Sequence, residues 1–160
     1  MKILMLDCDG VINHHAVYAE CAKRPGQTKP EDWVDPVCVA LVNEICARTG
    51  AVIVVSSSWR NYLKGGGVGV RDVLALRGLT AEVVGHTLLL ADRHKLDWYD
   101  GNRWDEIKHW LEGHPEVTHW AVLEDALVDG IPPENLVRTT LEEGLTREGV
   151  ERAVSILTGV

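Results

Sequence analysis

The sequence predicts an α/β fold with a mostly parallel sheet of about five strands and helices on both faces. Two observations lead to this prediction. Short apolar runs alternate along the chain with longer stretches of helical period, as they do in strand–helix–strand units. The run AVIVVS at 51–56 is also β-branched and apolar on both parities, which is typical of a central parallel strand covered on two sides.

The other predicted strands are apolar runs that end at turn residues or at polar clusters. The first is Lys2–Leu6, and it leads directly into an acidic stretch. Three further runs follow later in the chain, at about 82–85, 118–125 and 135–139.

Four segments have the period and the end signals of helices. In DPVCVALVNEICARTG, Pro36 suits a first helical turn and Gly50 suits the C-terminal stop. Thr146 is the expected N-cap of the last helix. The predicted helices lie within 35–50, 70–78, 103–115 and 146–157.

Length and composition indicate one compact domain over residues 1–160. The chain is 46% apolar, which is enough for a full core, and we expect residues 14–35 to form only a short flap. The N-terminus has no secretory pattern, no run approaches the roughly 20 apolar residues of a membrane span, and the four cysteines form no CxxC pair. We therefore expect a cytoplasmic protein without a membrane partner.

The charge of the chain argues against general adhesion to nucleic acid. The net charge is −8, whereas such adhesion depends on Lys and Arg that neutralise phosphates. Basic residues are nevertheless frequent between Arg60 and Arg103. The alternative of a local basic surface on an otherwise acidic protein therefore stays open.

Chemistry-bearing side chains follow the predicted strands. Asp7 and Asp9 come after the first strand, three serines from Ser56 follow the second, and Glu124 and Asp125 end the run at 118–125. Ligands of parallel sheets collect at the carboxyl ends of the strands, so we expect these groups to converge.

Carboxylates packed this closely raise one another's pKa unless a cation lies among them. Hard oxygen ligands without a Cys/His set favour Mg²⁺ over Zn²⁺. With Mg²⁺ drawing charge from a phosphoryl group, an Asp can attack phosphorus and form an aspartyl-phosphate. A second carboxyl two residues further on can serve as the general acid and base.

Four motifs resemble those of the haloacid dehalogenase (HAD) superfamily phosphatases in order and spacing. They are DCDGVIN, VIVVSSSWR, the region of Arg103, and VLEDALVD. The details SSSWR, RWDEIKHWL and WAVLED resemble HAD domains of RNA-repair proteins, and more distantly the phosphatase domain of polynucleotide kinase-phosphatases. The resemblance implies a Rossmann-like, doubly wound core without a full cap domain.

The resemblance also implies a role for each residue of the first two motifs. Asp7 would be the nucleophile and a metal ligand. Asp9 would be the general acid and base, with its backbone carbonyl on the metal. Ser56 would bind the phosphoryl oxygens, and Ser57 is the alternative because three adjacent serines leave the register open.

The later motifs supply the remaining charges. Arg103 would neutralise the transition state, with Lys95 as the competing cation. Asp125 would be the third metal ligand. Glu124 would orient a metal-bound water, and its direct contact with the metal is left open. We expect Arg60 and Lys95 to contact the substrate.

An open site without a cap suits a large substrate, so the predicted partner is a phosphorylated polynucleotide end or a nucleotide. Trp33, Trp59 and Trp98 fall in predicted loops and are candidates for base stacking. Two alternatives stay open: a phosphatase of small phosphate esters, and a non-catalytic metal-binding or interaction domain. The pair His14 and His15 is expected in a solvated loop.

Overall fold

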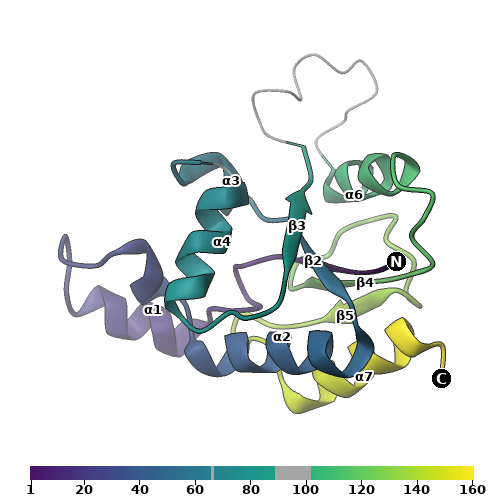
Figure 1. The fold of residues 1–160 in the computed structure, drawn as a ribbon. Coiled ribbons are helices and arrows are strands. Elements are labelled where there is room, and N and C mark those ends of the chain that lie inside the picture. The colour runs from purple at the N-terminus through teal and green to yellow at the C-terminus, as the bar shows by residue number, and fades with distance from the viewer. Residues whose placement is uncertain (66, 89–101) are drawn as a thin grey trace.

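The computed structural model describes residues 1–65, 67–88 and 102–160. A five-stranded sheet of order β3-β2-β1-β4-β5 forms the centre of the molecule, and all of its strand pairs are parallel. Figure 1 shows helices on both sides of this sheet. The predicted α/β fold with about five parallel strands is therefore confirmed.

The strands begin and end close to the predicted limits. The first strand matches its predicted residues, and the others differ by one residue at each end. Their bounds are β1 Lys2–Leu6, β2 Val52–Val55, β3 Val83–His86, β4 His119–Glu124 and β5 Leu136–Arg138.

The four predicted helices are present, and in the described parts of the chain three further short helical segments accompany them. Those predicted are α2 Pro36–Thr49, α4 Gly67–Leu76, α6 Arg103–Glu112 and α7 Arg147–Thr158. The additional ones are α1 His15–Ala22, the 3₁₀ helix η1 Pro30–Trp33 and α3 Trp59–Tyr62.

Cap residues explain why α2 and α7 begin and end where they do. The Asp35 carboxylate accepts a hydrogen bond from the backbone of Val37, and Thr146 caps α7 through Gly149. Gly50 ends α2 with a φ of 70°, a conformation that costs glycine little.

The sheet buries both of its faces because side chains alternate along each strand. Leu4 and Leu6 of β1 belong to a core with α2, α4 and α7. Ile3 and Met5 point to the opposite face, where they pack in a second core with Ile107 of α6. Two covered faces fix the register of β1, and with it the position of the residues that follow its end.

Residues 14–35, here called the flap segment, contain more structure than the short flap that the sequence predicts. The segment forms α1 and η1, which contact each other. Only Cys21 of α1 is buried, so the sequence of this helix has no apolar stripe to reveal it.

No helix within the three described ranges is long and apolar enough to cross a bilayer. The sequence predicts a loop at about 89–102 that is rich in Asp, His and Lys. This loop lies outside the described residues except for Asn102, which caps α6 through the backbone of Trp104.

Candidate active site

The polar ends of β1, β2 and β4 meet at one edge of the sheet. β1 pairs with both neighbours in parallel register, so the residues after Leu6, Val55 and Leu123 come together. Asp7 donates its backbone N–H to the carbonyl of Leu123 at 3.2 Å, and Ser56 donates to Leu6 at 2.8 Å. The convergence expected from the strand order is therefore present (Figure 1).

Three carboxylates form the acid cluster of this edge: Asp7, Glu124 and Asp125. One oxygen from each lies within 4.8 Å of the others. Burial raises the pKa of Asp7 to about 6, although the charge of Arg103 and a hydrogen bond from Ser57 oppose the rise. Burial and the nearby Asp7 raise the pKa of Glu124 to about 8. Ionising all of these carboxylates together is therefore costly in this buried place.

The donor set of this cluster fits a divalent cation with hard ligands. The ligand atoms are carboxylate oxygens, which Mg²⁺ prefers, and the two raised pKa values show that the group lacks a sufficient positive partner. Asp7 and Asp125 are the residues that would hold the ion. One oxygen of Glu124 is already engaged, because it accepts a hydrogen bond from the backbone of Ala126 at 3.1 Å.

Gly10 makes room for Asp125 in the cluster. It has a φ of 66°, and a Cβ at this position would lie 2.3 Å from Asp125 Oδ2. Both features require glycine, since other residues rarely adopt this φ and the space belongs to the carboxylate. The turn after β1 is therefore shaped around a residue of the fourth motif.

Asp9 is held by three donors rather than joined to the acid cluster. Its Oδ1 accepts hydrogen bonds from Asn13 at 2.9 Å, Tyr18 at 2.9 Å and the indole of Trp59 at 3.0 Å. Burial and the Asp9 carboxylate raise the pKa of Tyr18, so its phenol stays protonated and continues to donate. The predicted contact of Asp9 with metal through its backbone carbonyl stays a prediction.

The serines after β2 differ in their surroundings. Ser57 contacts Asp7 and accepts a hydrogen bond from the backbone of Trp59 at 3.3 Å. Ser56 is 1% exposed, and its Oγ has no hydrogen-bond partner among the described residues. A buried hydroxyl without a partner is costly, so Ser56 Oγ keeps an unused capacity for a hydrogen bond, whereas Ser57 already uses its own. Which of the two serines binds a phosphoryl oxygen stays a prediction.

Arg103 reaches the acid cluster from the first turn of α6. Its Nε lies 3.8 Å from Glu124 Oε2, its Nη1 lies 3.3 Å from Glu106 Oε2, and its charge lowers the pKa of Asp7. The structure therefore places this predicted cation at the site. Lys95, the competing candidate, lies outside the described residues, as does Trp98.

Arg60 is placed differently from the predicted substrate contact. Its side chain is fully buried and forms an ion pair with Glu106, which is 2% exposed. It also donates to the carbonyls of Ser57 and Leu88, while Thr87 donates to the same Glu106 carboxylate. Arg60 therefore shares the Glu106 carboxylate with Arg103, and it contacts the turn after β2 through the carbonyl of Ser57.

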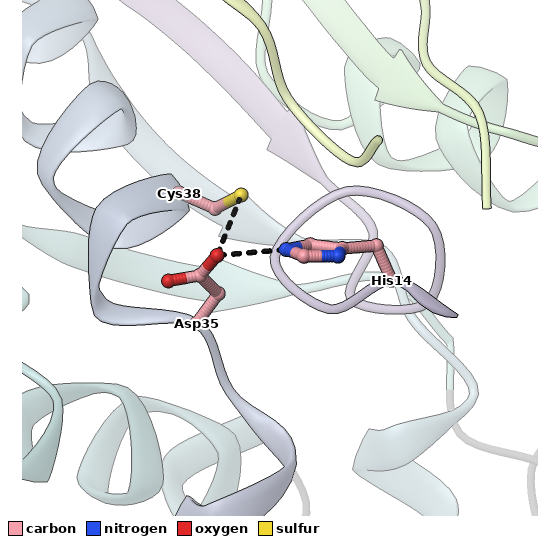
Figure 2. Close-up of side chains that lie close together, drawn as sticks. All are labelled: His14, Asp35 and Cys38. Carbon is pink, nitrogen blue, oxygen red and sulfur yellow. Dashed lines mark hydrogen bonds and ion pairs between the residues drawn. The ribbon is translucent and has the colours of Figure 1, made fainter. Parts of the chain in front are cut away.

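A second group of potential ligands lies beside the site, and Figure 2 shows its members His14, Asp35 and Cys38. The Asp35 oxygens are already occupied, one by the α2 cap and the other by His14 Nε2 at 2.7 Å. Burial raises the pKa of the Cys38 thiol to about 11, so it stays protonated at neutral pH. These contacts join the flap segment to α2, and the solvated loop expected around His14 is wrong for that residue.

Several residues of the site have no counterpart in the sequence prediction. Tyr18 and Glu106 are absent from it because neither is a sequence neighbour of its partner. Tyr18 lies nine residues after Asp9, and Glu106 lies 46 residues after Arg60. Asn13 had a local signal, since a side-chain amide shortly after an Asp-Gly turn often closes it, and here Asn13 Oδ1 accepts from Gly10 at 3.0 Å.

The parallel sheet and the acids at its strand ends define a Rossmann-like core of the HAD type. The chain belongs to the family described as the HAD domain in Swiss Army Knife RNA repair proteins, whose profile matches residues 3–150. The resemblance found in the four motifs is thus confirmed, and the family indicates a phosphatase-type hydrolase. No curated protein and no solved structure matches the chain significantly.

Proposed function

We propose that this protein is a Mg²⁺-dependent phosphomonoesterase that acts through an aspartyl-phosphate on Asp7. The observation that supports it most is the juxtaposition of three groups: a buried carboxylate after β1, a hydroxyl after β2 that has no partner among the described residues, and a cation on the first turn of α6. Asp7 would be the nucleophile, Ser56 would hold a phosphoryl oxygen, and Arg103 would balance the charge of the transition state.

The first half of the reaction transfers the phosphoryl group to the protein. An oxygen of Asp7 attacks phosphorus, the bond from phosphorus to the ester oxygen breaks, and Asp9 gives its proton to the departing alkoxide. The three donors to Asp9 Oδ1 hold the carboxyl in place and leave Oδ2 to carry the proton. When bound to Asp7 and Asp125, Mg²⁺ would withdraw charge from the phosphoryl oxygens.

The second half releases phosphate. Asp9, now ionised, takes a proton from a water that attacks phosphorus, and the bond to Asp7 breaks to restore the carboxylate. The proposed substrate is a phosphorylated end of a nucleic acid or a nucleotide, which is supported by the description of the family as RNA-repair domains.

Hydrolysis of p-nitrophenyl phosphate with and without Mg²⁺ tests this proposal. Asp7→Asn should lower the rate by at least about 10³-fold and abolish covalent labelling by substrate phosphate. Asp9→Asn should slow both labelling and release by about 10²–10⁴-fold. The matched control is Asp72→Asn, an exposed acid on α4 that pairs only at the surface with Arg71. A wild type no faster than Asp7→Asn would refute the proposal.

A further inference from the structure

An aromatic groove shares Trp59 with the surroundings of Asp9, and the proposed chemistry does not use it. Two tryptophans and a tyrosine line it, together with apolar neighbours and one cation: Trp33, Trp59, Tyr62, Pro30, Leu63 and Lys29. Its volume is about 320 Å³, within the range of roughly 300–1,000 Å³ typical of ligand pockets. Tyr62 is 78% exposed, although a tyrosine without a ligand or partner is usually better covered.

The groove is connected to Asp9 through two of its three hydrogen-bond donors. Trp59 lines the groove and also donates its indole N–H to Asp9 Oδ1. Tyr18 donates to the same oxygen, and its ring contacts Trp33 at a centroid distance of 5.7 Å. One wall of the groove is thus in direct contact with the proposed general acid.

We infer that the groove binds the nucleobase of the nucleotide whose phosphate Asp7 attacks. This inference rests on the proposed function, since it is the leaving alcohol that faces Asp9. Flat apolar walls of Trp and Tyr suit the π-face of a base, and base–aromatic stacking tolerates any base identity. Lys29 at the rim provides a positive charge for the sugar–phosphate chain that continues from the base.

The overall charge of the protein agrees with a local contact of this kind. A net charge of −8 disfavours adhesion along a phosphate backbone, so affinity for a nucleic-acid end must come from a short-range contact. Stacking in the groove is such a contact. It favours a leaving alcohol that carries an aromatic base over the alcohol of an aliphatic phosphate ester. The substrate class is thus a nucleoside monophosphate at a chain end, not a sugar or glycerol phosphate.

Steady-state kinetics on two substrates would test the inference. The probes are a 3′-phosphorylated RNA tetramer and glycerol 2-phosphate, and the readout is the ratio of their kcat/KM values. Trp33→Ala and Tyr62→Ala should each lower this ratio at least about fivefold, through KM for the RNA. Tyr62→Phe keeps a stacking ring and should preserve the ratio, as should Leu76→Ala, an exposed apolar residue of α4. An unchanged ratio in both alanine variants would overturn the inference.

Calorimetric binding separates the groove from the reaction. In an Asp7→Asn background with Mg²⁺, the same RNA tetramer should bind, and Trp33→Ala should weaken its Kd at least about fivefold. Binding that depends on Trp33 in a protein whose wild type hydrolyses nothing would remove the proposed function and keep the groove. If the wild type hydrolyses the RNA phosphate but the groove variants bind RNA as tightly as their Asp7→Asn parent, the proposed function stands and the groove inference is overturned. Absence of RNA binding in every variant would overturn the groove.

Discussion

The strand ends and the flap segment lie on either side of Asp9 and are built in different ways. At the strand ends, backbone hydrogen bonds and the register of β1 position Asp7, Ser56 and Glu124. The flap segment contacts the rest of the molecule through side-chain bonds, such as Tyr18 on Asp9 and Arg77 of α4 on Asp32, as well as through backbone bonds such as that from His15 to Leu141. The acids are therefore fixed by topology, while the surroundings of the proposed general acid depend on individual side-chain contacts.

This difference implies that the two regions respond differently to substitution. A change at the strand ends acts on buried charges in a place that water does not reach, where errors are costly. A change in the flap segment acts on half-buried contacts whose loss water can partly replace. The predictions below compare one change in each region where the chain offers a matched pair.

The largest effect is expected for the buried arginine behind the strand ends. Arg60→Met leaves Glu106 buried beside one cation fewer, which should lower the free energy of unfolding by about 3–5 kcal/mol. The matched change is Arg77→Met, because Arg77 joins α4 to the flap segment through a partly exposed pair and should cost about 1 kcal/mol or less. Urea denaturation measures both.

The same pair decides what Arg60 does. If the Arg60→Met variant is as stable as the wild type but has a higher KM, Arg60 contacts the substrate, as the sequence predicts. Its ion pair with Glu106 would then not be its main role. A loss of stability of the expected size supports the structural role that the contact with Glu106 indicates.

A glycine pair compares the turn after β1 with a turn of the flap segment. Gly10 and Gly26 both have a φ near 70°, but only at Gly10 would a Cβ meet Asp125, whereas nothing lies within 4 Å of Gly26. Gly26→Ala should cost about 1 kcal/mol of stability with normal kcat/KM. Gly10→Ala should also displace Asp125 and lower kcat/KM about 10²-fold. Equal kinetic losses would show that Gly10 serves only the turn.

The sequence predicts the strand ends well because their signals are local. An apolar run such as Lys2–Leu6 that is followed by acids indicates both a buried strand and the edge of the sheet at which the strand ends. In the same way, Thr146 indicates the start of α7 because it is a typical N-cap residue. Three such strand ends, after β1, β2 and β4, predicted that Asp7, Ser56 and Asp125 lie at one edge of the sheet, and Asp7 and Asp125 are indeed close together in the acid cluster.

The surroundings of these residues were not predictable in the same way. Helix α1 carries one buried residue, so its sequence has no periodic stripe, and Tyr18 is directed to Asp9 only by how that helix docks. Arg60 has the sequence context of a surface cation, and its burial depends on Glu106 arriving from another helix. Such contacts are set by packing between distant segments, which a single sequence does not record.

The acid cluster and the flap segment should also differ in how pH affects their contributions to stability. The raised pKa values of Asp7 and Glu124, about 6 and about 8, mean that the folded protein holds protons that the unfolded chain releases. Their contribution is complete below the unfolded values near 4 and is lost as the pH rises towards 8. Asp32 has a lowered pKa, chiefly because the backbone of Lys29 donates to it, so its contribution is lost in acid.

Thermal unfolding in EDTA and in Mg²⁺ measures this effect. Metal-free protein should lose thermal stability between pH 5 and pH 8, by about 2–4 °C in Tm for each kcal/mol. Mg²⁺ should raise Tm more at pH 8 than at pH 5, because it binds the ionised carboxylates. Glu124→Gln should flatten the slope in EDTA. A Tm in EDTA that rises towards pH 8 would contradict the charge assigned to the cluster.

The smallest effect is expected for a single hydroxyl of the flap segment. Tyr18→Phe removes one of three donors to Asp9 Oδ1 and keeps the ring against Trp33. Asn13 and Trp59 continue to hold the carboxylate, so kcat should fall by no more than about tenfold with KM unchanged, and stability by about 1 kcal/mol. Tyr18→Ala also removes the ring, so KM for the RNA tetramer should rise as well. If Tyr18→Phe lowered kcat as much as Asp9→Asn, the flap segment would be as essential to the chemistry as the strand ends, and the distinction between the two regions would fail.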